Sequence, residues 1–146
     1  MKIEELTSEL LCSVEVRDFE KEDLRDNLSK NLGVYMSSDF KKAVINNQNK
    51  VVLAYGGKIE SDLVAWVWMI GSEIINENPI ASLETLMSLE SMAIKEARER
   101  GIKFFYTLNH PHFKFALKYL RRMGYSERGS HLCSDNVERL IMVKEI

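Results

Sequence analysis

The chain has 146 residues, the usual size of one domain, so we expect a single domain over residues 1–146. A hydrophobic fraction of 45% with 9% aromatic residues supplies enough apolar surface for a packed core and excludes a disordered chain. The formal charge is −2, from 20 basic and 22 acidic residues, so overall electrostatics give no reason to expect binding to nucleic acid.

The N-terminal residues and the apolar runs argue against secretion and against a membrane span. Residues 1–5 are charged and lack the apolar core of a signal peptide. The longest apolar run, Leu63–Ile70, is far too short to cross a bilayer. Cys12 and Cys133 form no CxxC pair, and two reduced thiols are a simpler reading than a disulfide between the chain ends. We therefore expect a cytoplasmic protein without membrane contact.

Apolar spacing in the first third of the chain predicts one strand and several helices. The predicted elements are a short helix or lead-in over 6–11, a strand over 14–17, a helix over 20–28, a helix over 37–45 and a polar stop over 46–49. Asp18 offers a capping side chain for the second helix, and Ser37 or Ser38 for the third.

The remainder of the chain alternates strands and helices. We expect a strand over 51–55 ended by a turn at Gly56-Gly57, a central strand over 63–70, a helix over 82–100 preceded by Pro79, a strand over 102–108, a helix over 111–123 and a final strand over 137–143. Gly101 and Gly124 are the expected helix stops. This order predicts an α/β fold with a mixed central sheet flanked by helices.

The element order and several short motifs resemble the GNAT acyltransferases. Val14–Phe19 with Glu22-Asp23-Leu24 is similar to the family's first strand and first helix, and Ala93–Gly101 resembles the end of its central helix. Asn109 after a strand, followed by Tyr119–Tyr125, resembles its last helix and Gly-aromatic closure. The resemblance implies acyl transfer from an acyl-CoA, such as acetyl-CoA, to an amine. Small phage-encoded proteins with GNAT-like folds show a comparable pattern, which implies a virion as an alternative location.

The segment that matches the family's phosphate loop departs from its pattern. The family grips the pyrophosphate with Arg/Gln-x-x-Gly-x-Gly/Ala, whose glycines and free N–H groups admit the anion at the start of the central helix. Here the corresponding stretch, Ala81–Leu86, has no glycine, and Glu84 is expected in the first turn, where a carboxylate repels phosphate. The resemblance assigns cofactor contacts to Met69, Ile70, Ser82, Leu83, Glu84, Thr85 and Asn109.

Two side chains are candidates for the chemistry. Glu73, just past the tryptophan-rich strand, is a candidate general base that acts through water, or else a solvated carboxylate. The family's general acid is a tyrosine one turn before the glycine, where this chain has Leu120; the neighbouring Tyr119 points about 100° away and is the candidate. The fold also implies that loop 46–50 and connector 73–79 flank the acceptor entrance.

Other polar and aromatic residues keep two readings. Trp66 and Trp68 line a groove or pack in the core. His110 and His112 lie close together in sequence, but no neighbouring ligand completes a set, so we expect no metal site. The basic residues of the last helix contact CoA phosphates or an acidic partner, or form a solvated face; they are Lys114, Lys118, Arg121 and Arg122.

Two functions from different classes therefore stay open. The first is an acyl-CoA-dependent N-acyltransferase with an amine acceptor. The second is a GNAT-shaped protein without chemistry that binds or inhibits a protein partner or belongs to a virion. The altered phosphate loop favours the second function, and the complete order of elements is compatible with both.

Overall fold

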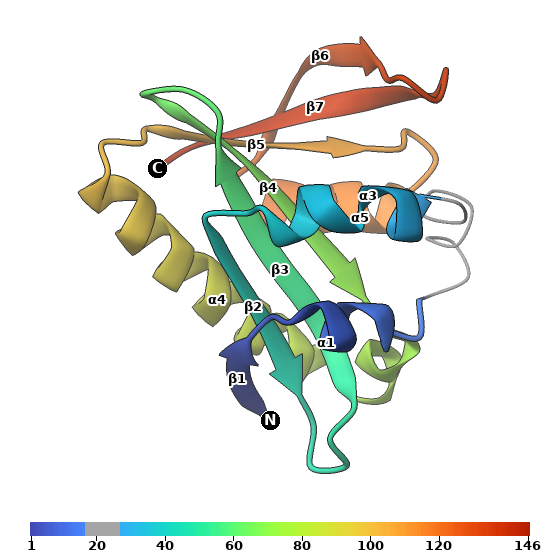
Figure 1. The fold of residues 1–146 in the computed structure, drawn as a ribbon. Coiled ribbons are helices and arrows are strands. Elements are labelled where there is room, and N and C mark those ends of the chain that lie inside the picture. Colours follow the sequence, from blue (N-terminus) through green and yellow to red (C-terminus); the bar gives the residue numbers. More distant parts are fainter. Residues whose placement is uncertain (17–26) are drawn as a thin grey trace. The chain divides into compact units, whose positions relative to one another are not determined.

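The computed structural model describes residues 1–16 and 27–146, whose strands form one seven-stranded mixed sheet (Figure 1). The sheet order is β1-β2-β3-β4-β5-β7-β6, with β4 and β5 parallel. The strands are β1 Lys2–Glu5, β2 Phe40–Ile45, β3 Val51–Ile59, β4 Val64–Gly71, β5 Phe104–Asn109, β6 Ser126–Leu132 and β7 Glu138–Glu145. The helices are α1 Ser8–Cys12, α3 Asn27–Met36, the 3-10 helix η1 Glu73–Glu77, α4 Pro79–Glu99 and α5 Lys114–Arg122. The predicted fold class is confirmed.

The chain divides into two compact units. The first unit comprises Met1–Lys58 and Trp68–Ala93, and the second comprises Ile59–Val67 and Ile94–Ile146. The expectation of a single domain over the whole chain stays a prediction.

In the first unit, β1, β2 and β3 pair antiparallel, and the helix expected over 37–45 was wrong. Residues 40–45 form β2 because the asparagine cluster closes a tight turn instead of merely stopping a helix. The side-chain oxygen of Asn46 accepts the N–H groups of Gln48 and Lys50 at 3.0 Å each, and Asn49 adopts a φ of 60°. This turn joins β2 directly to β3 and buries Ala43, Val44 and Ile45 in the core.

Gly56 and Gly57 lie inside β3, so the turn expected there was also wrong. Both glycines make room for an aromatic ring. A Cβ at Gly56 would lie 2.4 Å from Cζ2 of Trp68, and one at Gly57 would lie 2.1 Å from Cζ of Phe40. The pair therefore marks close packing against a strand and not a chain reversal.

The N-terminal strand was expected too late in the sequence. The first strand is β1, whose alternating charged residues hide it, and the strand expected over 14–17 reduces to a single bridge between Val16 and Ser72 in the described residues. The short helix expected over 6–11 is α1, capped by the Thr7 hydroxyl, which accepts the Leu10 N–H at 3.2 Å. Arg17, Phe19 and Glu22–Leu24 lie outside the described residues.

In the second unit, β5 lies between β4 and β7. β4 and β5 pair from Val64 opposite Phe104 to Trp66 opposite Tyr106, while β5 pairs with β7 along its whole length. β6 was missed because all seven of its residues are exposed and no apolar alternation marks it. α5 begins at Lys114 and not at Pro111, because His110 accepts the Phe113 N–H with its carbonyl and the His112 N–H with Nδ1 in a turn before the helix.

The two glycines predicted to end helices both have positive φ angles. Gly101 and Gly124 adopt φ values of +83° and +94°, as the expected helix ends require. No helix in the described ranges combines the length and the apolar character that a bilayer span needs.

Candidate functional site

The start of α4 differs from its expected position by three residues. The helix begins at Pro79 and not at Ser82, because Pro fits the first helical position and Asn78 caps it. The first turn of α4 therefore contains no acidic residue, and the expectation of Glu84 in that turn was wrong. Glu84 is exposed and lies in the second turn.

The N–H groups in the first turn of α4 are largely occupied. Pro79 has no N–H, the Ala81 N–H donates to Oδ1 of Asn78 at 3.3 Å, and the Ser82 N–H donates to the Asn78 carbonyl at 3.1 Å. In the described part of the chain, only Ile80 among these four residues keeps an N–H without a hydrogen-bond partner. A diphosphate needs several converging donors, and this turn does not supply them.

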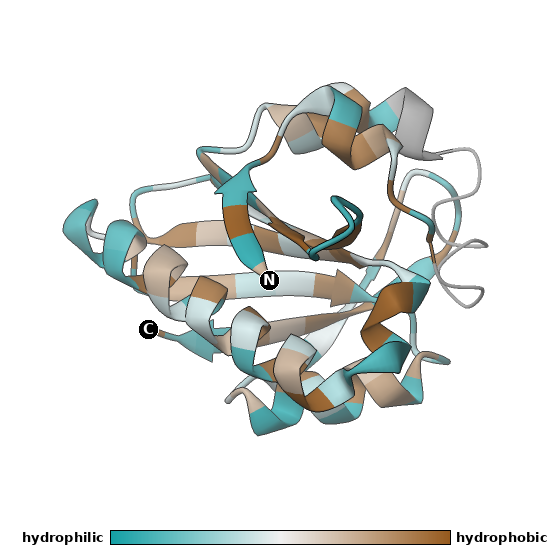
Figure 2. Cartoon of the chain, turned by 90° about the horizontal axis from the view of Figure 1, so that it is seen from below, coloured by the Kyte–Doolittle hydropathy of each residue, from teal (hydrophilic) through white to brown (hydrophobic). Residues whose placement is uncertain are grey.

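The predicted cofactor residues of α4 lie inside the helix. The Thr85 hydroxyl donates to the Ala81 carbonyl at 2.8 Å, so it is occupied. Ser82 is 3% exposed, and it shares the buried side of α4 with Leu86 and Leu89 at helical spacing. Its hydroxyl has no hydrogen-bond partner among the described residues. Figure 2 shows hydrophilic and hydrophobic residues alternating along α4, as expected of a helix with one buried side.

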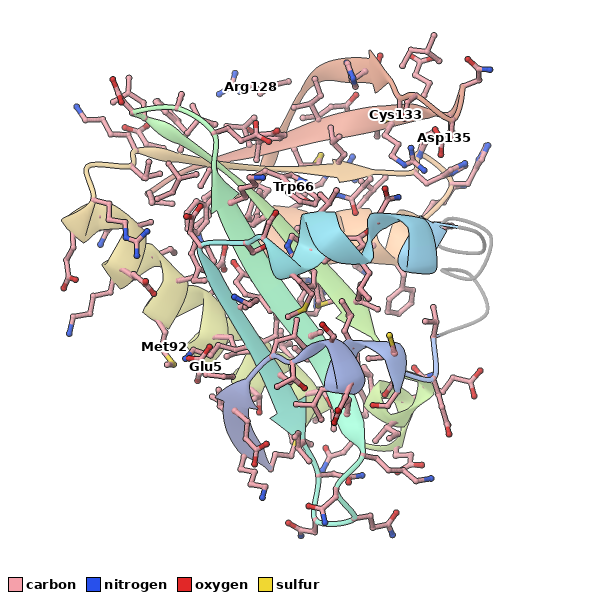
Figure 3. The ribbon with its side chains drawn as sticks, viewed as in Figure 1. Glu5, Trp66, Met92, Arg128, Cys133 and Asp135 are labelled. Atoms are coloured by element: carbon pink, nitrogen blue, oxygen red, sulfur yellow. The ribbon has the colours of Figure 1, made fainter. Side chains whose placement is uncertain are left out.

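Met69 and Ile70 lie in the part of β4 that belongs to the first unit. Met69 is half-buried and Ile70 is buried. The preceding Trp68 is buried, donates its indole N–H to the Ser38 hydroxyl at 2.9 Å and contacts Tyr35 edge-on with ring centroids 4.8 Å apart. The core reading of Trp68 is therefore confirmed, whereas Trp66 is half-buried in the second unit (Figure 3).

A polar depression of about 360 Å³ lies in the first unit, where the structure brings the β2–β3 turn and η1 together. Its lining residues are Glu15, Asn46, Gln48, Lys50, Glu73, Ile74, Asn76 and Glu77. Glu73 is exposed, and its N–H donates to the Glu15 carbonyl at 3.1 Å, which ties η1 to the segment before residue 17. The part of the lining that the structure describes holds three carboxylates and one ammonium group, a balance that favours cations.

Only part of the lining of this depression was expected from the sequence. The resemblance pointed to loop 46–50 and connector 73–79, which both line it, but it gave no role to Glu15. Glu15 had been expected in a strand. No local signal could place Glu15 near Glu73, because β2, β3 and β4 all lie between the two residues in the sequence.

Asn109 and Tyr119 lie in the second unit. Asn109 ends β5, and its Nδ2 is buried without a hydrogen-bond partner in the part of the chain that the structure describes. A buried amide donor without a partner costs free energy of folding. Tyr119 is half-buried on α5, next to Leu120.

Tyr106 stands where the β4–β5 pairing ends. Its hydroxyl donates to the Glu60 carboxylate. Burial, followed by this hydrogen bond and the negative charge of Glu60, raises the pKa of Tyr106, so the side chain stays protonated at neutral pH.

The two neighbouring histidines do not form a metal centre with other side chains. The rings of His110 and His112 lie 4.9 Å apart, and His110 also lies beside Phe113. Within residues 1–16 and 27–146, no three histidine, cysteine or acidic side chains gather in a way that could hold a metal ion. The basic residues of α5 are exposed, and Arg121 lies 3.9 Å from Glu127.

No family model matches the sequence, and no curated protein is similar to it. Solved structures are similar over almost the whole chain. An IAA acetyltransferase from Bacillus cereus is 11% identical with a TM-score of 0.71, covering 99% of this chain and 99% of that one. An acetyltransferase of the GNAT family from Streptococcus pneumoniae is 13% identical with a TM-score of 0.64, covering 99% of each. An aminoglycoside 6′-N-acetyltransferase in complex with coenzyme A is 14% identical with a TM-score of 0.68, covering 99% and 97%.

These similarities show that the chain has the fold of the GNAT N-acetyltransferases. The GNAT fold implies a CoA thioester as the acyl donor. The described residues fit the pantetheine half of CoA but not the half that carries the diphosphate. The partnerless Nδ2 of Asn109 suits an amide carbonyl of the pantetheine arm. The first turn of α4 does not fit the diphosphate, because its N–H groups are occupied by Asn78 or absent in Pro79.

Proposed function

We propose that the chain is a GNAT-type N-acyltransferase that moves an acyl group from a pantetheine thioester, such as acetyl-CoA, to an amine. The observation that carries the proposal is the buried, partnerless amide of Asn109 at the end of β5. The thioester supplies an activated acyl carbon. Met69 and Ile70 would offer the backbone of β4 to the donor, as a preformed polar edge that needs no reorganisation.

The polar depression of the first unit supports an amine acceptor. Among its described lining residues, Glu15, Glu73 and Glu77 outnumber Lys50, which favours an ammonium group there over an anion. An ammonium must lose a proton before it can attack, and the exposed Glu73 carboxylate would accept that proton through a water molecule.

Tyr119 is the proposed general acid. When the new C–N bond forms and the C–S bond breaks, the leaving sulfur needs a proton, which a tyrosine hydroxyl can donate. We propose Tyr119 for this role because it is the half-buried tyrosine of α5, the helix that corresponds to the family's last helix.

Titration calorimetry with acetyl-CoA tests the assignment of Asn109. Asn109→Ala removes the donor, and we expect the dissociation constant to rise about tenfold, as loss of one buried hydrogen bond predicts. Asn76→Ala is the matched control, because Asn76 is exposed on η1 and outside the proposed donor contacts. Equal affinity of Asn109→Ala and the natural protein would contradict the assignment.

One observation favours a second function. The occupied start of α4 is also what we expect of a GNAT-fold protein that has lost donor binding and serves as a binding module for a protein partner. This alternative predicts that titration with acetyl-CoA gives no binding heat. Cooperative unfolding of the same protein on heating would show that it was folded during the titration.

A further inference from the structure

We infer that the chain recognises its acyl donor through the pantetheine thioester and makes little use of the ADP half of CoA; this inference rests on the proposed function. It starts from the mismatch at the first turn of α4. Asn78 occupies the Ala81 and Ser82 N–H groups, and Pro79 has none, so an incoming diphosphate meets one available N–H, that of Ile80.

The side chains of this turn cannot replace the missing N–H groups. Ile80 is 71% exposed and apolar, and Ala81 carries no polar group. Ser82 is only 3% exposed as a whole residue and packs with Leu86 and Leu89, so its partnerless hydroxyl faces the interior of the unit. Asn109 differs in that only its Nδ2 is buried, while the residue as a whole is half-buried.

The charges before α4 oppose a diphosphate as well. Glu73 and Glu77 belong to η1, which ends two residues before Pro79, and Glu15 joins them in the depression. Among the described residues that line this depression, Lys50 is the one basic side chain. A group with several negative charges is therefore repelled on the side from which the chain enters α4.

No glycine lets the backbone re-form around a phosphate at this place. The first turn is Pro-Ile-Ala-Ser, and the φ angle of proline is fixed by its ring. Opening a cradle would break the cap at Asn78 and the first bonds of a 21-residue helix. The donor's specificity must then come from the thioester and the pantetheine amides, for which Asn109 keeps an unused donor.

The test compares two donors by titration calorimetry at moderate salt. We expect acetyl-CoA and S-acetylpantetheine to bind with dissociation constants within about threefold of each other, and 3′,5′-ADP to give no binding heat. Two results would overturn the inference while leaving the proposed function intact. One is an acetyl-CoA affinity more than about 100-fold above that of S-acetylpantetheine, and the other is competition of 3′,5′-ADP with acetyl-CoA. If neither thioester binds, the proposed function fails, and the inference fails with it.

A variant provides an independent readout. Asn78→Gly removes the side-chain cap and frees the Ala81 N–H, so the affinity for acetyl-CoA should rise about threefold while the affinity for S-acetylpantetheine stays constant. Unchanged binding of S-acetylpantetheine serves as the internal control that the variant is folded. A thermal melt checks the folding of the variant independently. An unchanged acetyl-CoA affinity in a folded variant would contradict the inference that the cap at Asn78 prevents the first turn of α4 from binding the diphosphate.

Discussion

Gly56 is the residue at which one missing side chain decides how the core of the first unit packs. The indole of Trp68 lies over its Cα, and a Cβ there would come within 2.4 Å of Cζ2, 2.6 Å of Cε2 and 2.9 Å of Nε1. Trp68 cannot easily turn aside, because its N–H donates to the Ser38 hydroxyl and its ring contacts Tyr35. The overlap therefore falls on a ring that is held in place.

Gly56→Ala should lower the free energy of unfolding by about 1–3 kcal/mol, the usual range for overpacking a rigid core. Gly33→Ala is the matched control. Gly33 lies in α3 with nothing within 4 Å of a new Cβ, so the same substitution should raise the free energy of unfolding by about 0.5–1 kcal/mol. Chemical denaturation measures both. A Gly56→Ala variant as stable as the natural protein would show that the indole does not lie over the strand.

The turn between β6 and β7, which contains Asp135 (Figure 3), is stabilised by an ion pair. Arg139 donates from Nη1 and Nη2 to the two carboxylate oxygens of Asp135, at 3.1 and 2.9 Å. The same carboxylate accepts the Val137 N–H at 3.1 Å, and Asn136 reverses the chain with a φ of 61°. The Arg139 hydrogen bond lowers the pKa of Asp135 below its ordinary value of 3.8, with a smaller contribution from the Val137 N–H.

This lowered pKa predicts how the turn responds to acid. The charged form is favoured in the folded state, so the stabilisation is complete above pH 4 and is lost as the pH falls through the folded-state pKa. Asp135→Asn keeps an oxygen for the Val137 N–H but loses the charge. We expect it to cost about 1 kcal/mol or less at pH 7, because the pair is partly exposed, and to cost progressively less as the pH falls through the folded-state pKa of Asp135.

Denaturation of both proteins across this pH range measures the effect. Glu96→Gln is the control, because Glu96 and Arg100 form a more exposed pair on a helix end, and its effect should be smaller. A loss of stability in Asp135→Asn that does not diminish as the pH is lowered would point to the shape of the turn and not to its charge.

The elements that the sequence predicts well are those with long apolar patterns. β4, α4 and β5 were expected with end points a few residues off, because each presents a continuous or periodic apolar pattern. β1 and β6 were missed because they present charged or exposed residues, and their strand character comes from pairing with β2 and β7. Pairing between distant segments leaves no local signal.

At the scale of the whole molecule, the order of elements carries the fold, whereas the site depends on details that the order does not contain. Asn109 was expected at the end of a strand and lies there, but its partnerless amide could not be foreseen. The occupied start of α4 depends on Asn78, which lies outside the motif that the family pattern covers. Capping bonds and buried donors are fixed by packing, so the sequence indicates where to look but not what is available to a ligand.

The central claim is that the chain transfers acyl groups, and release of the donor thiol tests it most directly. With acetyl-CoA and a panel of primary amines and polyamines, we expect thiol release that depends on the amine and falls about 100-fold in Tyr119→Phe, with Tyr35→Phe as the control. If the protein binds acetyl-CoA but releases thiol no faster with any amine than without one, this fold serves binding here and not acyl transfer.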